Sequence, residues 1–196
     1  MADVFAPDRF RATIGNNFGL AFTNRFQVKF PKIDGLVKPN GGAVFDKTTS
    51  EDRALFCTAA GMPGKQLNTV NRGYGIENQL AVTGHTMPEV GFTFYLANTL
   101  SMREYFERWM QAASSTTHDE AQYVGYYEEY SRFDVEVASF ARVGAKGYTV
   151  KLFNCFPTSI NTIEFNNQPQ TQAAEMTVSI AYRTYKTKQE LTAPIG

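Results

Sequence analysis

Alternation of apolar and polar side chains in several separate segments limits most strongly how this chain can fold. It occurs in Arg25–Phe30, Val90–Leu96, Phe133–Val137, Tyr148–Leu152 and Met176–Tyr182. In a β-strand, successive side chains point to opposite faces, so each segment has one apolar face to bury and one polar face. The 16 phenylalanines and 10 tyrosines favour strands as well. The sequence therefore predicts antiparallel β-sheets.

One segment has a helical period instead. Ser101 and Glu104 have the spacing of a capping box, which predicts a helix start. Arg103 and Glu107 stand four residues apart, as do Glu104 and Arg108, so both pairs can form ion pairs on the helix surface. Apolar residues on the other side form one stripe, which we expect to pack on a sheet rather than to hold a cofactor. The residues of this stripe are Met102, Tyr105, Phe106, Trp109, Met110 and Ala113.

These elements predict one mainly β domain, an antiparallel β-sandwich or barrel with one flanking α-helix. We expect an N-terminal arm at residues 1–24, the β domain at 25–185 and a C-terminal tail at 186–196. Within the domain we expect a buried strand at 53–58. Residues 31–52 form a loop that is unusually long for a compact domain.

The net charge and the lack of targeting signals limit the classes of function that the sequence supports. Lysine plus arginine and aspartate plus glutamate both total 19, so the chain lacks the basic excess typical of nucleic-acid binders. Zero net charge also removes the self-repulsion that opposes self-association. The first residues lack the features of a signal peptide. No apolar run approaches the ~20 residues of a membrane span, so we expect no membrane anchor.

The sequence offers no chemistry that points to an enzyme. His85 and His118 have no Cys or His partners at metal-ligand spacing. The segment 61–66 lacks the flanking residues of a phosphate loop. Glu128 and Glu129 are adjacent, so they point to different sides and make a poor acid/base pair. We predict no catalytic residues, no metal and no cofactor.

The two cysteines, Cys57 and Cys155, lie far apart in sequence, each within an apolar run. A buried free thiol behaves as a small apolar side chain. We therefore expect two buried free thiols rather than a disulfide.

Several stretches, taken in order, resemble the tail tube proteins of contractile-tailed (myovirus-type) bacteriophages. Leu55–Gly64 is similar to the family's strand that ends in a Pro-Gly turn, and Met102–Trp109 is similar to its single helix. Leu152–Ile160 and Glu175–Arg183 look like its closing aromatic-Pro-Thr turn and final strand. The set spans most of residues 25–185. The N-terminal extension, the long loop and the C-terminal tail depart from the family pattern.

The resemblance implies the tail-tube fold and a structural role. Hexameric rings would stack into a hollow tube inside a contractile sheath, with a baseplate at one end and a terminator at the other. The protein would lie in the virion tail, assembled in the host cytoplasm. DNA would pass through without binding, along neutral or acidic, hydroxyl-rich walls. Strand faces that could supply such a wall carry Thr177, Ser179 and Ala181, or Asp134 and Glu136.

The loop 31–52 is the candidate for contacts between rings. It could instead be an ordinary surface loop, and its length does not distinguish the two. Deleting residues 36–48 is expected to abolish tubes and to leave a soluble fold. Its polar residues, which could fix the register of the contact, are Asp34, Lys38, Asn40, Asp46, Lys47, Glu51 and Asp52.

Other functions stay open. The chain could be a baseplate-proximal initiator, a tail terminator or the tube subunit of an injection system. In a different class, it could be a monomeric module that holds a carbohydrate on Tyr126, Tyr127 and Tyr130. A monomer mass that does not change with concentration would favour the latter.

Overall fold

The structure is a computed structural model of the 196-residue chain. It describes residues 11–12, 14–15, 20–34, 36–37, 43–44, 50–74, 77–115, 124–141, 146–163 and 173–189. The elements in chain order are β1 (Phe26–Lys29), β2 (Leu36–Val37), β3 (Ala43–Val44), α2 (Ser50–Leu55), β4 (Cys57–Ala60), β5 (Gln66–Tyr74), β6 (Glu77–Thr86), β7 (Val90–Tyr95), α3 (Ser101–Ala113), α4 (Tyr127–Tyr130), β8 (Phe133–Phe140), β9 (Lys146–Ile160), β10 (Glu175–Ala181) and β11 (Thr184–Gln189).

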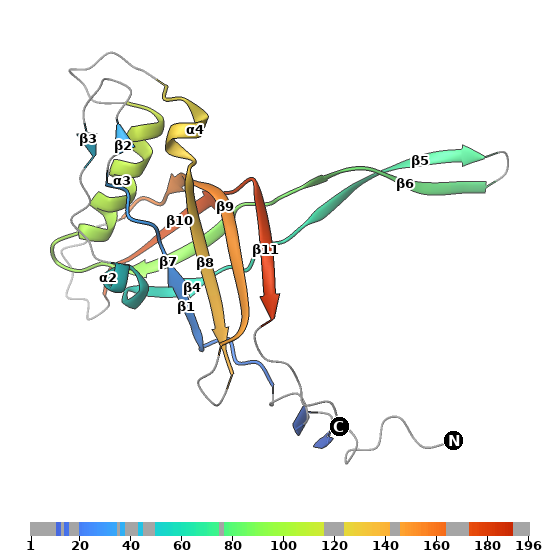
Figure 1. The fold of residues 1–196 in the computed structure, drawn as a ribbon, viewed down its shortest axis with the longest axis horizontal. Helices are drawn as coiled ribbons and strands as arrows, with labels where there is room; N and C mark the ends of the chain where they lie inside the picture. Colours follow the sequence, from blue (N-terminus) through green and yellow to red (C-terminus); the bar gives the residue numbers. More distant parts are fainter. Residues whose placement is uncertain are drawn as a thin grey trace.

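The long strand β9 belongs to two sheets (Figure 1). Its first part pairs with β8 and β11, and its last part pairs with β10. We call the order β1-β8-β9-β11 the β11 sheet and the order β4-β7-β10-β9 the β7 sheet. β9 passes from one to the other near Asn154, whose φ of 55° is a left-handed conformation that asparagine tolerates better than most residues. The predicted antiparallel β architecture with few helices is confirmed.

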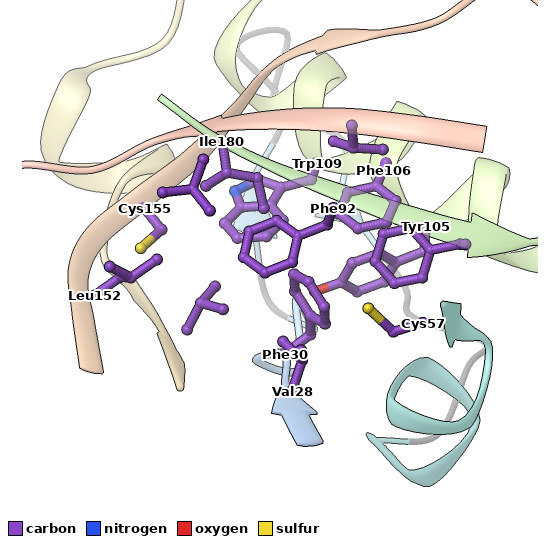
Figure 2. Close-up of a cluster of buried hydrophobic side chains, with 14 of the residues drawn as sticks. Val28, Phe30, Cys57, Phe92, Tyr105, Phe106, Trp109, Leu152, Cys155 and Ile180 are labelled. Carbon is purple, nitrogen blue, oxygen red and sulfur yellow. The ribbon is translucent and has the colours of Figure 1, made fainter. Parts of the chain in front are cut away.

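The apolar rows of the alternating segments form the core. Met176, Val178 and Ile180 of β10 are all fully buried. Figure 2 shows aromatic rings from three separate segments meeting there. The ring of Phe30 lies edge-on to that of Phe92, with centroids 5.2 Å apart. Alternation in the sequence therefore identifies the buried face of these strands.

Helix α3 covers one side of the sheets (Figure 1). Four residues of the predicted stripe, Met102, Tyr105, Phe106 and Trp109, are buried, whereas Met110 is half-buried. The predicted ion pairs of the exposed side are confirmed. They join Arg103 to Glu107 and Arg108 to Glu104.

The predicted capping box at the start of α3 is wrong. The N-cap residue is Leu100, with φ 50°, and it makes no side-chain cap hydrogen bond. Ser101 is therefore the first residue within the helix and cannot act as its cap. The Glu104 carboxylate turns along the helix to Arg108 instead.

The predicted strand at 53–58 is wrong in its first half. Ser50–Leu55 form helix α2, and the strand begins at Cys57. The side chain of Leu55 is 82% exposed, whereas Arg53 is buried with its guanidinium 4.8 Å from the ring centre of Tyr105. A short apolar run does not distinguish a strand from a helix end, which explains the error.

Both cysteines are buried and free, as predicted. Burial raises the pKa of the Cys57 thiol and of the Cys155 thiol to about 12 in each case. Both thiols therefore stay protonated and chemically inert at neutral pH.

Candidate assembly surfaces

The β5–β6 hairpin extends far from the body of the protein (Figure 1). Nine residue pairs join its strands, from Gln66 opposite Thr86 to Tyr74 opposite Glu77. An isolated two-stranded hairpin is marginally stable in water. A projecting hairpin of this length therefore points to a partner that covers it.

One face of the hairpin carries a row of exposed apolar side chains. Leu67 is 53% exposed, Val82 59% and Leu80 72%. The register places Thr69 opposite Val82 and Asn71 opposite Leu80, so these residues share a face with Leu67. We call Leu67, Leu80 and Val82 the hairpin row. Gathered apolar side chains on an exposed element are typical of an interaction surface.

Sequence reasoning missed this hairpin. Both its faces are largely exposed, so no buried row imposes a clear period of two on its residues. The available signal was the pair of glycines, Gly73 and Gly75, between segments that contain the β-branched residues Thr69, Val70, Val82 and Thr83.

The β11 sheet has an open strand at each side. Among the described residues, β1 pairs only with β8, and β11 pairs only with β9. Each strand therefore has one edge whose backbone N–H and C=O groups face no neighbouring strand. Such edges favour pairing with another chain.

The face of the β11 sheet turned away from the core is polar. The register places Lys29, Glu136, Lys151 and Lys186 in one row across the four strands. The Lys29 ammonium lies 3.7 Å from the Glu136 carboxylate. We call this surface the lysine face.

The residues expected to form a channel wall lie in two different sheets. Thr177, Ser179 and Ala181 belong to β10 in the β7 sheet, whereas Asp134 and Glu136 belong to β8 in the β11 sheet. Both carboxylates are ion-paired with lysines of the lysine face. The two groups therefore do not form one surface.

The segment 31–52, predicted as one long loop, contains the paired strands β2 and β3 and the start of α2, and it begins as part of the body. Ile33 and Leu36 are buried in the core, and the Tyr105 hydroxyl donates a hydrogen bond to the Pro31 carbonyl oxygen over 2.8 Å. Asp34 is ion-paired with Lys32 at 2.7 Å.

Of the other predicted contact residues, Glu51 is exposed on α2. The predicted contact residues that lie outside the described residues are Lys38, Asn40, Asp46 and Lys47, together with the side chain of Asp52. The ring contact of this segment stays a prediction.

The tyrosines of the suggested carbohydrate module do not form a shared platform. Tyr126 is 81% exposed, but the rings of Tyr127 and Tyr130 pack edge-on against Phe156, with centroids 6.1 Å and 5.2 Å from it. His85 is exposed on the hairpin, and His118 lies outside the described residues.

In the described part of the chain, no cluster of three or more His, Cys, Asp or Glu side chains could hold a metal ion. No helix in the same residues has the length and apolar character to cross a membrane.

Solved structures of low sequence identity share the fold. The baseplate of the anti-feeding prophage, 6-fold symmetrised, matches with 13% identity over 88% of this chain and 98% of the other, at a TM-score of 0.58. The tube-terminating cap of the anti-feeding prophage matches with 13% identity over 87% of this chain and 91% of the other, at a TM-score of 0.56. The sheath–tube complex of an extracellular contractile injection system matches with 12% identity over 87% of this chain and 92% of the other, at a TM-score of 0.50.

Comparison with protein families is more specific. A search of curated proteins found no match. The family model described as "Phage tail tube protein" matches residues 21–188, which include both sheets, the hairpin and α3. The chain therefore belongs to the phage tail tube protein family, as the resemblance in its sequence predicts.

Proposed function

We propose that the chain is the structural subunit of a tail tube, in which hexameric rings stack into a hollow conduit inside a contractile sheath. Family membership supports the tube, and the description of one structural neighbour as 6-fold symmetrised supports the ring size. The observation that carries the proposal is the open edge on each side of the β11 sheet.

Ring closure follows from these edges. If β1 of one copy lies beside β11 of the next, the sheet continues from subunit to subunit. A rotation that closes this head-to-tail contact gives a ring without open edges in that sheet. The core, the β7 sheet and α3 all lie on one side of the β11 sheet, and the bulkier layer needs the larger circumference. The lysine face would therefore line the channel.

Stacking needs a second interface that repeats without closing. The hairpin suits it because it projects from the body and presents the hairpin row. Covering Leu67, Leu80 and Val82 against another copy would remove apolar surface from water. The segment 31–52 stays a second candidate for this contact.

The remaining partners are part of the same proposal. Structural neighbours described as a sheath–tube complex, a baseplate and a terminating cap support contacts with a sheath and with proteins at the two ends of the tube. We place the protein in the virion tail after assembly in the host cytoplasm, with DNA passing through the channel. We assign it no catalytic role.

A second candidate function is a tube initiator or terminator. Two of the structural neighbours are described as parts of a baseplate and a cap, which favours this alternative. Such a subunit would form rings that do not stack without a template.

Truncating the hairpin tests the proposal. Residues 69–83 are replaced by Asn-Gly, which supplies a tight turn and keeps Asn68 opposite Gly84. The truncated protein is expected to fold, because none of the residues of this segment whose burial the structure describes lies in the buried core. Microscopy is expected to show single rings but no stacked tubes. Long tubes of the same width from the truncated protein would contradict the stacking role.

A further inference from the structure

We propose that the lysine face is a cationic surface that contacts the phosphate backbone of nucleic acid without regard to sequence. Its position in the channel rests on the proposed function, whereas its charge rests on the described residues. The proposal reverses the expectation of a neutral or acidic wall.

The charges on this face are strongly unequal. The lysines are in β1, β9 and β11, and the carboxylates are in β8. Among the described residues of this face, five lysines stand against two carboxylates, an excess of three formal positive charges in a chain whose formal net charge is zero. The residues are Lys29, Lys146, Lys151, Lys186, Lys188, Asp134 and Glu136.

The ion pairs within the lysine face leave an excess of positive charge on it. The Glu136 carboxylate is shared by Lys29 at 3.7 Å and Lys146 at 3.4 Å. Lys151 pairs with Asp134 at 3.0 Å, and its side chain is still 47% exposed. Each carboxylate is thus already neutralised while ammonium groups stay open to water. The face can accept an anion without breaking a pair.

Lys186 is the best-placed free cation. Its side chain is exposed, and no carboxylate among the described residues forms an ion pair with it. Its ammonium lies 5.7 Å from the ring centre of Phe153, and that of Lys151 lies 5.1 Å from the same ring. The aromatic ring holds both cations at the face.

The form of the face favours a phosphate polymer over a protein partner. Protein interfaces depend on large apolar anchors that are fully desolvated. Phe153 is covered by two ammonium groups. Neighbouring positions on this face hold Gln27, Thr149 and Thr184 and one small apolar residue, the buried Ala138. Lysines spaced by about 4.8 Å between strands and about 6.8 Å along a strand form a flat array of charges instead. Such an array suits non-specific backbone contact, which depends on lysine and arginine.

In a ring, every copy would present the same array to the channel. Each contact between a lysine and a phosphate is weak and depends on the salt concentration. A nucleic acid held by such contacts can slide along the protein surface. The wall would therefore hold a nucleic acid without fixing its position.

The test measures binding of a short fluorescein-labelled oligothymidylate to the full chain by fluorescence anisotropy over a salt series. Protein concentrations are kept where light scattering shows no tubes, so that the face is accessible. The test variant is Lys186→Gln/Lys188→Gln. The matched control, Arg103→Gln/Arg108→Gln, also removes two positive charges, but from helix α3 on the other side of the sheet.

Wild-type affinity is expected to fall linearly with salt on logarithmic axes. Each lost phosphate contact lowers the slope by about 0.7 for a single strand, so the lysine variant should lose about 1.4. The control should keep the wild-type slope. No binding at low salt, an equal loss in both variants, or equal competition by polyglutamate would overturn the proposal. Lysine-dependent binding by a chain that never forms rings would refute the proposed function and leave this inference standing.

Discussion

Replacing Leu80 and Val82 with serine should weaken stacking and leave the subunit intact. Leu80 is 72% exposed and Val82 59% exposed in the isolated chain, so both lose little on mutation there. Fully burying such a side chain contributes about 1.5–3 kcal/mol. Covering the exposed parts of both against another copy would contribute about 2–4 kcal/mol per contact.

The size of the effect follows from this free energy. Each 1.4 kcal/mol changes an equilibrium constant about tenfold. The protein concentration at which tubes begin to form should therefore rise between about 30-fold and about 700-fold. Sedimentation of assembled material over a concentration series measures this threshold. The free energy of unfolding of the subunit should change by less than about 0.5 kcal/mol, as is usual for exposed positions.

Gln79→Ser is the matched control, because Gln79 is exposed and lies on the opposite face of the same hairpin strand. It should leave the threshold unchanged. An unchanged threshold in the Leu80/Val82 variant would refute burial of the hairpin row between copies. An equal rise in the control would show that the hairpin acts through its backbone rather than through this row.

Three further predictions concern the core and the long loop. Trp109→Phe should lower the free energy of unfolding by about 2–4 kcal/mol in urea titrations, because it removes volume from a buried site and the 2.9 Å hydrogen bond from the indole N–H to the Tyr130 carbonyl oxygen; a change under about 1 kcal/mol would contradict the packing. The pKa of the Cys155 thiol is raised from 9.0 to about 12, so its stabilising effect is complete below pH 9 and is lost as the pH rises toward 12. Stability should fall over that window, and less steeply in Cys155→Ala; equal slopes would contradict the burial effect. Asp46→Asn/Lys47→Gln should raise the tube-forming threshold if the segment 31–52 joins rings, and an unchanged threshold would leave the hairpin as the contact.

The sequence predicted the elements in which buried residues recur with a clear period. In β7, β8 and β10, apolar and polar side chains alternate because one face of each strand packs on the core. The apolar stripe of α3 can be recognised because one side of the helix is buried and the other faces water. The resemblance to the family rested on Leu55–Gly64, Met102–Trp109, Leu152–Ile160 and Glu175–Arg183, and the family model confirms it. Errors arose in short stretches. Arg53–Leu55 is apolar enough for a strand yet forms a helix, and the local turn at Leu100 displaces the expected cap.

The assembly surfaces could not be predicted from sequence in the same way. The hairpin exposes both faces, so its strands lack the buried row that gives a periodic signal. The lysine face depends on cross-strand register, which brings Lys29, Lys151 and Lys186 together although they are far apart in the chain. The zero net charge of the whole sequence concealed this local excess.

Self-assembly through open sheet edges is what we propose for this protein. Negative-stain microscopy of the purified protein over a concentration series, with mass by light scattering on the same samples, tests it most directly. We expect rings and hollow tubes of uniform width, with a mass that grows in multiples of a hexamer. A monomer mass at every concentration, with neither rings nor tubes in the images, would contradict it.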